Sequence, residues 1–246
     1  MYKLKNVTDN KNIDTIQSMG GFHVLEHKSD LSVGYEGATN AYFAQKMNIK
    51  RRQLLVELEN NSVTIQAGAM QWTLGDVTSG TGIKGAGDLI GKMFASKVTG
   101  ESAIKPEYHG NGLLMLEPTY KNIILVDVGQ WGSIVLDDGM FLACDSNLQM
   151  KVVARSTLSS AVVGGEGLFN LSLNGKGVAA LESPVPMSEL FEIELQDDTM
   201  KIDGNMAVAW SNSLKFTVEK SSKSLVGSAV NGEGLVNVYR ELAKYL

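Results

Sequence analysis

A short glycine-containing segment recurs along this 246-residue chain and constrains its fold more than any other feature. It reads Gly-Glu-Gly-Leu-Phe-Asn-Leu at 165–171 and Gly-Glu-Gly-Leu-Val-Asn-Val at 232–238, and a looser copy, Gly-Asn-Gly-Leu-Leu-Met-Leu, occupies 110–116. In each copy the glycines favour a tight turn and the apolar residues that follow favour a strand. The recurrence therefore predicts a β fold built from repeated units.

A second pattern, in which two apolar arms flank a polar middle, also recurs three times. Residues 56–65 read Val-Glu-Leu-Glu-Asn-Asn-Ser-Val-Thr-Ile, and residues 193–202 read Ile-Glu-Leu-Gln-Asp-Asp-Thr-Met-Lys-Ile. A middle version runs through 126–136, with a slightly longer polar segment. The first arm alternates apolar and polar residues with the period of a half-buried strand, so we predict a hairpin in each copy.

Turn residues punctuate the same region. Asparagine–glycine and aspartate–glycine pairs favour the positive φ angles of tight hairpins. Three of the four prolines stand at two junctions, 117–118 and 183–186, where the missing backbone donor ends a strand. These signals predict an all-β chain. The glycine pairs begin at Asn111, Asp138, Asn174, Asp203 and Asn231.

The repeats suggest one domain, 1–246, with internal repeats rather than several domains. Repeat 1 covers 52–118 and carries a glycine-rich insertion at 78–99, repeat 2 covers 122–183, and repeat 3 covers 189–240. Repeats of this size seldom bury their apolar faces alone, so we expect the three to pack together as one body.

Short helices are expected only outside the repeated strands. Residues 38–47 favour a short helix capped by Thr39 or Asn40. Apolar spacing favours an amphipathic helix at 88–94 inside the insertion and another short helix in the tail, 239–246. The sequence assigns no role to residues 1–50, where we expect a turn at 19–21 and a strand at 22–27, or to the insertion.

The composition excludes some classes of function. A net charge of −5 argues against a dedicated nucleic-acid binder, which needs a clustered basic face. The single cysteine, Cys144, forms no internal disulfide and fits a reducing compartment. Residues 1–6 lack the apolar run of a secretory signal, and no apolar window approaches the roughly 20 residues that span a bilayer. We expect a cytoplasmic protein without an integral membrane segment.

Two glycine loops resemble phosphate-binding motifs but lack the necessary context. Residues 80–85, Gly-Thr-Gly-Ile-Lys-Gly, match the dinucleotide pattern literally, yet that site also needs a βαβ unit, and hairpins are expected on both sides here. Gly91-Lys92-Met93 resembles the end of a P-loop. Ala86 stands where the leading glycine belongs, and Met93 replaces the magnesium-binding hydroxyl residue. We interpret the first as a glycine loop and reject the second.

The histidines do not form a metal site on spacing. His23 and His27 flank Glu26, but on a strand residues four apart lie about 13 Å from each other. Zinc ligation needs bonds of about 2 Å, so the two could share a metal only on a helix. His109 has no histidine neighbour in the sequence. We interpret all three as structural or surface residues.

The remaining reactive residues also have structural interpretations. The acidic pairs 137–138 and 197–198 lack the loop pattern of a calcium site and fit turns. Glu166 and Glu233 recur inside the glycine segment, where Asn111 replaces the carboxylate in the first copy.

Cys144 could act as a nucleophile, but no cysteine–histidine signature accompanies it and Trp210 takes its place in the next repeat, which favours packing. The basic run 50–52 fits the start of a solvated strand. We therefore assign no catalytic, cofactor-binding or metal-ligating residue, and no cofactor.

Several segments are similar to those of one known family, over most of 50–240. They are glycine-turn motifs: Ala-Gly-Ala-Met at 67–70, Gly-Glu-Ser-Ala at 100–103, Tyr-His-Gly-Asn-Gly at 108–112, Leu-Glu-Pro at 116–118, and the closing turns at 165–168 and 231–234. Together they resemble the bacterial branch of the family related to the mitochondrial-biogenesis protein named for altered inheritance of mitochondria.

The resemblance implies a particular fold and little about chemistry. It implies three copies of a unit similar to the tryptophan RNA-binding attenuation protein, a short double-stranded β-helix or β-sandwich. It brings no established catalytic residues. The mitochondrial relative is linked to inner-membrane organisation. The RNA-binding role of the attenuation protein is an analogy of fold alone, and the acidic charge opposes it.

Three hypotheses about function follow. The first is a non-enzymatic β scaffold that binds a protein partner or assembles with itself as a homo-oligomer, since repeated sheets offer edges that must be covered. The second is a small-ligand or metal-binding barrel of the cupin kind, with enzymatic activity as one form of it. The third, binding of single-stranded RNA, predicts retention on oligonucleotides at low salt, which we do not expect. We favour the first.

Overall fold

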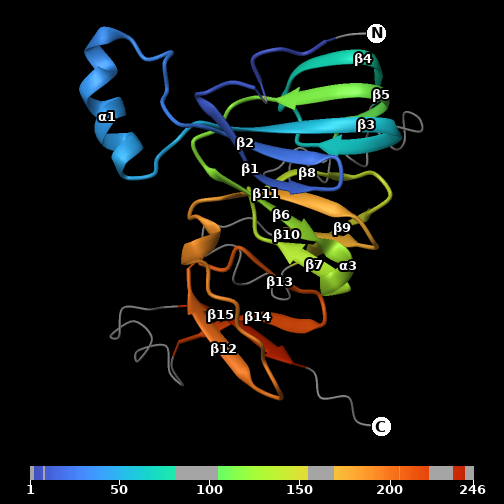
Figure 1. The fold of residues 1–246 in the computed structure, drawn as a ribbon. Helices are drawn as coiled ribbons and strands as arrows, with labels where there is room; N and C mark the ends of the chain where they lie inside the picture. Colours follow the sequence, from blue (N-terminus) through green and yellow to red (C-terminus); the bar gives the residue numbers. More distant parts are fainter. Residues whose placement is uncertain are drawn as a thin grey trace.

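A computed structural model describes residues 3–7, 9–80, 105–154, 169–204, 206–221 and 235–241. Within these residues the fold is all-β, as the sequence predicts, and the strands form three sheets. Figure 1 shows the sheets arranged along one long axis, with β4 and β5 at one end and β12 at the other. The helical elements are α1 (Ala38–Lys46), the single-turn α3 (Val128–Trp131), and the 3-10 turns η1 (Tyr35–Gly37) and η2 (Met187–Glu189).

The first group of strands contains β3 (Arg52–Ile65), β4 (Met70–Gly80) and β5 (Glu107–Leu116). The last of the three, β5, pairs with both of the others and lies between them. An N-terminal hairpin, β1 (Ile13–Met19) and β2 (Phe22–His27), adds to β3 through β2. The predicted strand at 22–27 and the turn before it are therefore confirmed, with Gly20 at a φ of 55°.

The second group has the same order, with each long strand broken in two. β11 (Val178–Ser183) lies between β6 (Asn122–Asp127) and β8 (Phe141–Asp145). β10 (Phe169–Asn174) lies between β7 (Ser133–Leu136) and β9 (Gln149–Ala154). Again the last part of the chain occupies the middle of the sheet.

The third group repeats this order with shorter strands. β15 (Leu235–Glu241) lies between β12 (Thr199–Asp203) and β14 (Leu214–Lys220), and β13 (Ala209–Ser211) precedes β14. One uniform shift along the sequence converts the pairings of β7, β10 and β9 into those of β12, β15 and β14. Thus Ser172 lies opposite Val135 and Lys151, and Val238 lies opposite Lys201 and Thr217.

Adjacent groups are joined by strand pairing, in the same way at both boundaries. β3 pairs with β8, placing Thr64 opposite Cys144, and β7 pairs with β13, placing Val135 opposite Trp210. The flanking backbone hydrogen bonds also correspond. At the first boundary Ser146 N donates to Ser62 O at 3.1 Å, and Gln66 N donates to Leu142 O at 2.8 Å. At the second boundary Asn212 N donates to Ser133 O at 3.0 Å, and Asp137 N donates to Val208 O at 3.1 Å.

The largest sheet is closed on itself by a side chain. Its strand order is β1-β2-β3-β8-β11-β6, so β1 and β6 are the two ends of this path. The Gln17 amide on β1 donates to the Leu125 carbonyl at 3.3 Å and accepts from the Leu125 backbone N–H at 3.0 Å. An amide side chain thereby takes the place of a strand between β1 and β6, and the enclosed space is filled by apolar residues such as Val24, Leu54 and Leu114.

The three predicted hairpins are wrong, because the polar segments bend the chain without reversing it. Residues 56–65 lie within the single strand β3, where Asn60 adopts a φ of 55° and makes a β-bulge opposite β5. In the other two polar segments Gly132 has a φ of 70° and Asp197 a φ of 52°. One left-handed residue is enough for a bulge, whereas the tight type I′ turn needs two.

The glycine segment at 110–116 is not a turn either, since it lies in the middle of β5. A Cβ on Gly110 would meet the Asp76 carbonyl oxygen at 1.9 Å, and one on Gly112 would meet the Leu74 carbonyl oxygen at 2.1 Å. Glycine is required there because two strands approach closely. The turns predicted at 165–168 and 232–234 lie outside the described residues, and the strands that follow, β10 and β15, are present.

The helix expected at 38–47 is confirmed as α1, but Gly37 occupies its N-cap in place of Thr39 or Asn40. Residues 78–80 of the expected insertion belong to β4, and the helix at 88–94 lies outside the described residues. The tail helix is wrong for residues 239–241, which belong to β15. The remaining tail, 242–246, lies outside the described residues.

Candidate functional site

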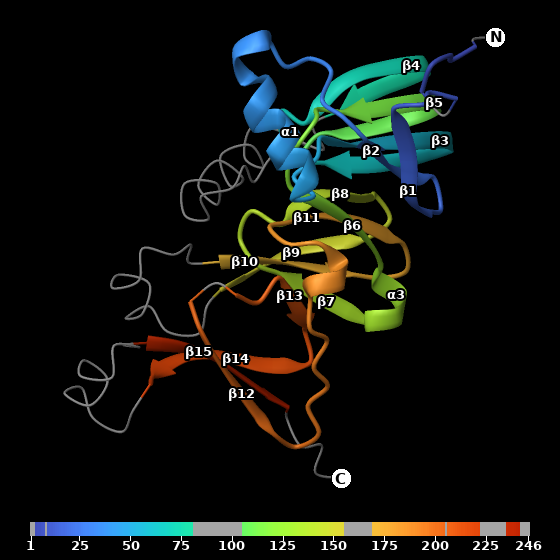
Figure 2. The same cartoon turned by 60° about the vertical axis from the view of Figure 1, so that its left-hand side comes forward.

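The segment between β2 and β3 leaves the sheet and carries α1, which stands to one side of the strands in both views (Figures 1 and 2). No residue of α1 is buried. Apolar side chains on and around the helix are nevertheless abundant, and each of the following is more than half exposed: Leu31, Tyr35, Tyr42, Phe43, Met47 and Ile49. We call these six residues the apolar platform.

The helix is short because both of its ends are set locally. Gly37 precedes it, and Asn48 follows it with a φ of 62°, the left-handed conformation that asparagine tolerates better than most residues. The Met47 N–H still donates to Phe43 O at 3.0 Å. The chain turns back toward β3 immediately after this point.

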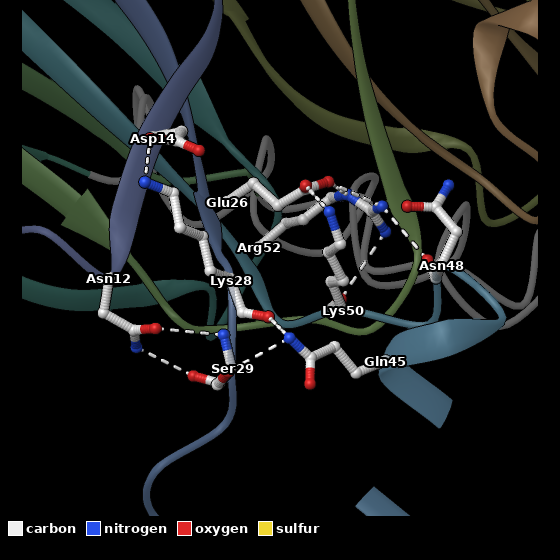
Figure 3. Close-up of polar contacts among 9 residues, drawn as sticks. All are labelled: Asn12, Asp14, Glu26, Lys28, Ser29, Gln45, Asn48, Lys50 and Arg52. Atoms are coloured by element: carbon white, nitrogen blue, oxygen red, sulfur yellow. Dashed lines mark hydrogen bonds and ion pairs between the residues drawn. The ribbon is translucent and has the colours of Figure 1, made fainter. Parts of the chain in front are cut away.

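A partly buried ionic cluster fixes this return (Figure 3). The Arg52 guanidinium is 2% exposed and donates to the Glu26 carboxylate through Nε at 2.9 Å and Nη2 at 2.8 Å. Lys50 forms an ion pair with the same carboxylate. Arg52 Nη2 also donates to the Asn48 carbonyl at 3.3 Å, at the end of α1. The expected solvated start of a strand at 50–52 is therefore wrong for Arg52, whose charge is held inside.

A second set of polar contacts ties the beginning of the segment between β2 and β3 to β1. The Asn12 amide donates to Ser29 O at 2.8 Å and accepts from Ser29 N at 3.0 Å. Lys28 and Asp14 form an ion pair at 2.8 Å. Gln45 of α1 donates to the Lys28 carbonyl and to Ser29 Oγ (Figure 3). Polar anchors therefore hold α1 in place, while its apolar side chains stay exposed.

A cavity of about 270 Å³ lies between α1 and the sheet. Arg51 lines it, donating to Ser32 Oγ at 3.0 Å through Nη1 and to His27 Nδ1 at 3.1 Å through Nη2. The Arg51 Nε is buried and has no hydrogen-bond partner among the described residues. His27 Nε2 lies 3.1 Å from the Gln53 amide oxygen. Because Arg51 can only donate and the Gln53 oxygen can only accept, His27 accepts at Nδ1 and donates at Nε2. Other lining residues are Asp30, Ala44, Ile49 and Tyr120.

Hydrogen bonds set the charge of Asp30 at the rim of this cavity. Those from the Ser32 and Tyr120 side chains lower the pKa of Asp30 to about 2, with a smaller contribution from Arg51. The same contact raises the pKa of the Tyr120 hydroxyl. Asp30 is therefore a carboxylate and Tyr120 a neutral donor over the physiological pH range.

The other two histidines each contact a serine. His23 Nδ1 lies 2.8 Å from Ser18 Oγ, and His109 Nδ1 lies 3.1 Å from Ser62 Oγ. His23 Nε2 has Glu57 at 3.7 Å. In the described part of the chain no three histidine, cysteine, aspartate or glutamate side chains gather closely enough to hold a metal ion.

The other sequence candidates lie apart from the cavity. Cys144 is fully buried in the core between sheets, and burial raises the pKa of its thiol to about 12. Asp145 accepts from the Val178 backbone N–H at 2.7 Å, and burial raises the pKa of that carboxyl. Asp137 accepts from the buried Asn170 amide at 3.1 Å. Glu166, Glu233 and most of the two glycine loops lie outside the described residues.

Sequence reasoning missed the polar cluster that positions α1. It depends on the register of β2 against β3, which places Glu26 opposite Arg52. A glutamate inside the apolar run 22–27 was the available signal, because a carboxylate seldom enters such a strand without a partner.

Among the helices that the structure describes, none is long and apolar enough to cross a bilayer.

Comparison with known proteins gives a consistent result. The family model described as mitochondrial biogenesis AIM24 matches residues 45–240. An uncharacterised protein of Streptococcus pyogenes serotype M6 is 32% identical over 194 residues, which are 75% of this chain and 76% of that protein. The X-ray structure of a Streptococcus pyogenes protein has a TM-score of 0.57 at 31% identity, covering 79% of this chain and 86% of that one.

Proposed function

The chain belongs to the mitochondrial biogenesis AIM24 family, and from this premise we propose that it is a non-enzymatic β scaffold that presents the apolar platform around α1 to a protein partner. The observation that carries the proposal is the exposure of the platform on and around a helix without a buried residue. Exposed apolar surface marks interaction sites in soluble domains when its side chains adjoin, and the Tyr42 and Phe43 rings of the platform are in contact.

The anchoring of α1 supports the same conclusion. A helix with these side chains could bury them against the sheet, yet the Glu26–Arg52 cluster and the Asn12–Ser29 contacts hold it away. Aromatic residues and methionine, which dominate the centres of protein interfaces, make up much of the platform, including Tyr42, Phe43 and Met47. A rigidly held surface also loses little conformational entropy when it binds.

The scaffold part of the proposal rests on the three strand groups. We interpret them as copies of one module similar to the attenuation protein, because each places its last strand between the first two. A homo-oligomer in the cytoplasm is part of this proposal, and the buried thiol of Cys144 fits a reducing compartment. The net charge of −5 supports a partner other than nucleic acid.

A site-specific photo-crosslinker tests the platform. Placed at Phe43 in the native host, it should capture one protein partner, whereas the same group at the exposed Glu59 on β3 should not. The purified partner should then bind the parent protein and lose at least tenfold in affinity for a Tyr42→Ser, Met47→Ser variant of unchanged melting temperature. Equal capture from both positions, or binding unaffected by the double variant, would contradict the proposal.

A small anionic ligand in the cavity under α1 is the second candidate. It is favoured by the buried Arg51 Nε, a donor without a hydrogen-bond partner in the described part of the chain, beside an open space of about 270 Å³. Inorganic phosphate and citrate are suitable probes. A millimolar concentration of either that raises the melting temperature of the parent protein, and not of Arg51→Gln, would support this candidate. No shift with either would remove it for these anions.

A further inference from the structure

The pairing between strand groups is a pattern that the described chain uses twice and leaves open at both ends. The first strand of one group pairs with the second strand of the next, at β3–β8 and again at β7–β13. Within the described ranges, the first strand of the last group, β12, pairs on one side only, with β15. Among the same residues, the second strand of the first group, β4, pairs on one side only, with β5.

We propose that β12 of one molecule pairs with β4 of a second copy of this chain, which extends the series of strand groups head to tail. The proposal rests on our interpretation of the groups as repeats and is independent of the platform on α1. Both views place β4 at one end of the molecule and β12 at the other (Figures 1 and 2), so the two strands of one chain do not meet.

The existing boundaries fix the register of the new one. Val135 corresponds to Lys201 by the uniform shift between the second and third groups. Cys144 corresponds to Thr73, because β8 pairs with β11 in the same pattern as β4 pairs with β5. In both of these pairings one residue of the second strand is skipped, Leu142 in β8 and Gln71 in β4. Lys201 should therefore lie opposite Thr73, as Thr64 lies opposite Cys144.

The free edge of β4 is correctly oriented for this pairing. The carbonyls of Leu74 and Asp76 point at β5, since they are the atoms that a Cβ on Gly112 or Gly110 would strike. Successive backbone groups alternate in direction along a strand, so those of Thr73 and Gly75 face away from β5. The register then predicts hydrogen bonds from Gly75 N to Thr199 O and from Asp203 N to Gln71 O.

Side chains also match across this register. On β12, Met200 and Ile202 are half-buried, and the residue between them is exposed. On β4, Trp72 and Leu74 are half-buried, and the residue between them is exposed. A slip of one residue would place every apolar side chain opposite a polar one. The predicted pairs are Met200 with Leu74, Lys201 with Thr73, and Ile202 with Trp72.

The third strand group has apolar surface for a second copy to cover. Met187, Phe191 and Ile193 precede β12 and are more than half exposed, and at the other end of the molecule Met70 begins β4 with its side chain exposed. Shifted back by one group, Phe191 corresponds to Leu125, a residue buried in the core. An interface between unlike surfaces continues as a filament unless its rotation closes a ring.

Disulfide trapping tests the register directly. Thr73→Cys and Lys201→Cys proteins, mixed and mildly oxidised, should form a mixed dimer, because opposite residues of a strand pair lie within the Cα separation that a disulfide spans. The native Cys144 is buried and should not interfere. Ser79→Cys, exposed on the same strand, is the matched control for Thr73→Cys.

A chain that carries both Thr73→Cys and Lys201→Cys gives a second readout. It should oxidise to a ladder of dimers, trimers and larger species or to one closed ring, whereas the mixed single variants stop at the dimer. An internally crosslinked monomer would overturn the proposal, because both strands of one chain would then meet. Crosslinking no greater than with Ser79→Cys, or equal formation of like–like dimers, would overturn it as well.

Discussion

The Arg52 guanidinium lies 2.8 Å from the Glu26 carboxylate, and the Arg52 side chain is buried while Glu26 is nearly so. This pair joins β2 to β3 and, through the Asn48 carbonyl, holds the end of α1. Breaking one partner of such a pair leaves an uncompensated charge inside the protein.

Glu26→Gln should therefore lower the free energy of unfolding by about 3 kcal/mol, because Arg52 stays buried without its carboxylate. Urea unfolding followed by tryptophan fluorescence measures the change, since Trp72 lies in the same sheet. Glu36→Gln, an exposed carboxylate in η1, is the control and should change the stability by less than about 0.5 kcal/mol. Equal effects of the two substitutions would show that the ion pair contributes nothing.

Gly112→Ala should destabilise the first strand group strongly. The added Cβ would meet the Leu74 carbonyl oxygen at 2.1 Å, so the β4–β5 pairing must shift. We expect a loss of about 2 kcal/mol or more by thermal or urea unfolding. Gly80→Ala is the matched control, because a Cβ there has no atom within 4 Å and the loss should stay below about 0.5 kcal/mol.

Acid should weaken the attachment of α1. The pKa of Asp30 is lowered to about 2 by Ser32 and Tyr120, whereas an unfolded aspartate titrates at about 3.9. A depressed acid stabilises the fold fully above its unfolded pKa, and this contribution is lost as the pH falls from about 4 to 2. Tyr120→Phe should raise the pKa of Asp30, as carboxyl carbon NMR can measure. An unchanged titration would contradict the assigned cause.

Cys144 should report the opening of the boundary between β3 and β8. Its thiol is fully buried opposite Thr64, and burial raises its pKa to about 12. Ellman's reagent at pH 8 should label the native protein far more slowly than the urea-unfolded protein. Because β3 covers this position, Thr64→Pro should speed labelling in the folded state. Ser79→Pro on β4 should leave the labelling rate unchanged, and equal rates for the two variants would show that labelling does not depend on this boundary.

The sequence predicted the class of fold because strand signals are local. The alternation in 56–59 and the helix signal at 38–46 depend on neighbouring residues, and β3 and α1 are present there. The hairpins failed because Asn60 favours a left-handed φ in a bulge as readily as in a turn. Only the partner strand decides between them, and β5 runs past this point without a break.

The candidate site could be predicted from the sequence to a much smaller extent than the class of fold. Its apolar residues are visible in the sequence. Their exposure, however, depends on the contact between Glu26 on β2 and Arg52 on β3, two strands separated by the segment that carries α1. The same holds for Gly110 and Gly112, whose need for glycine comes from the carbonyls of β4. Contacts between distant segments, rather than local propensity, decide these features.

The Gln17 bridge to Leu125 gives the cylinder formed by the largest sheet a seam. Elsewhere on the path β1-β2-β3-β8-β11-β6 the neighbouring strands share ladders of backbone bonds, whereas at the seam two bonds from one side chain join the strands. We therefore expect the wall to separate first along this line under force or heat, with the Gln17 amide as the group that holds it closed.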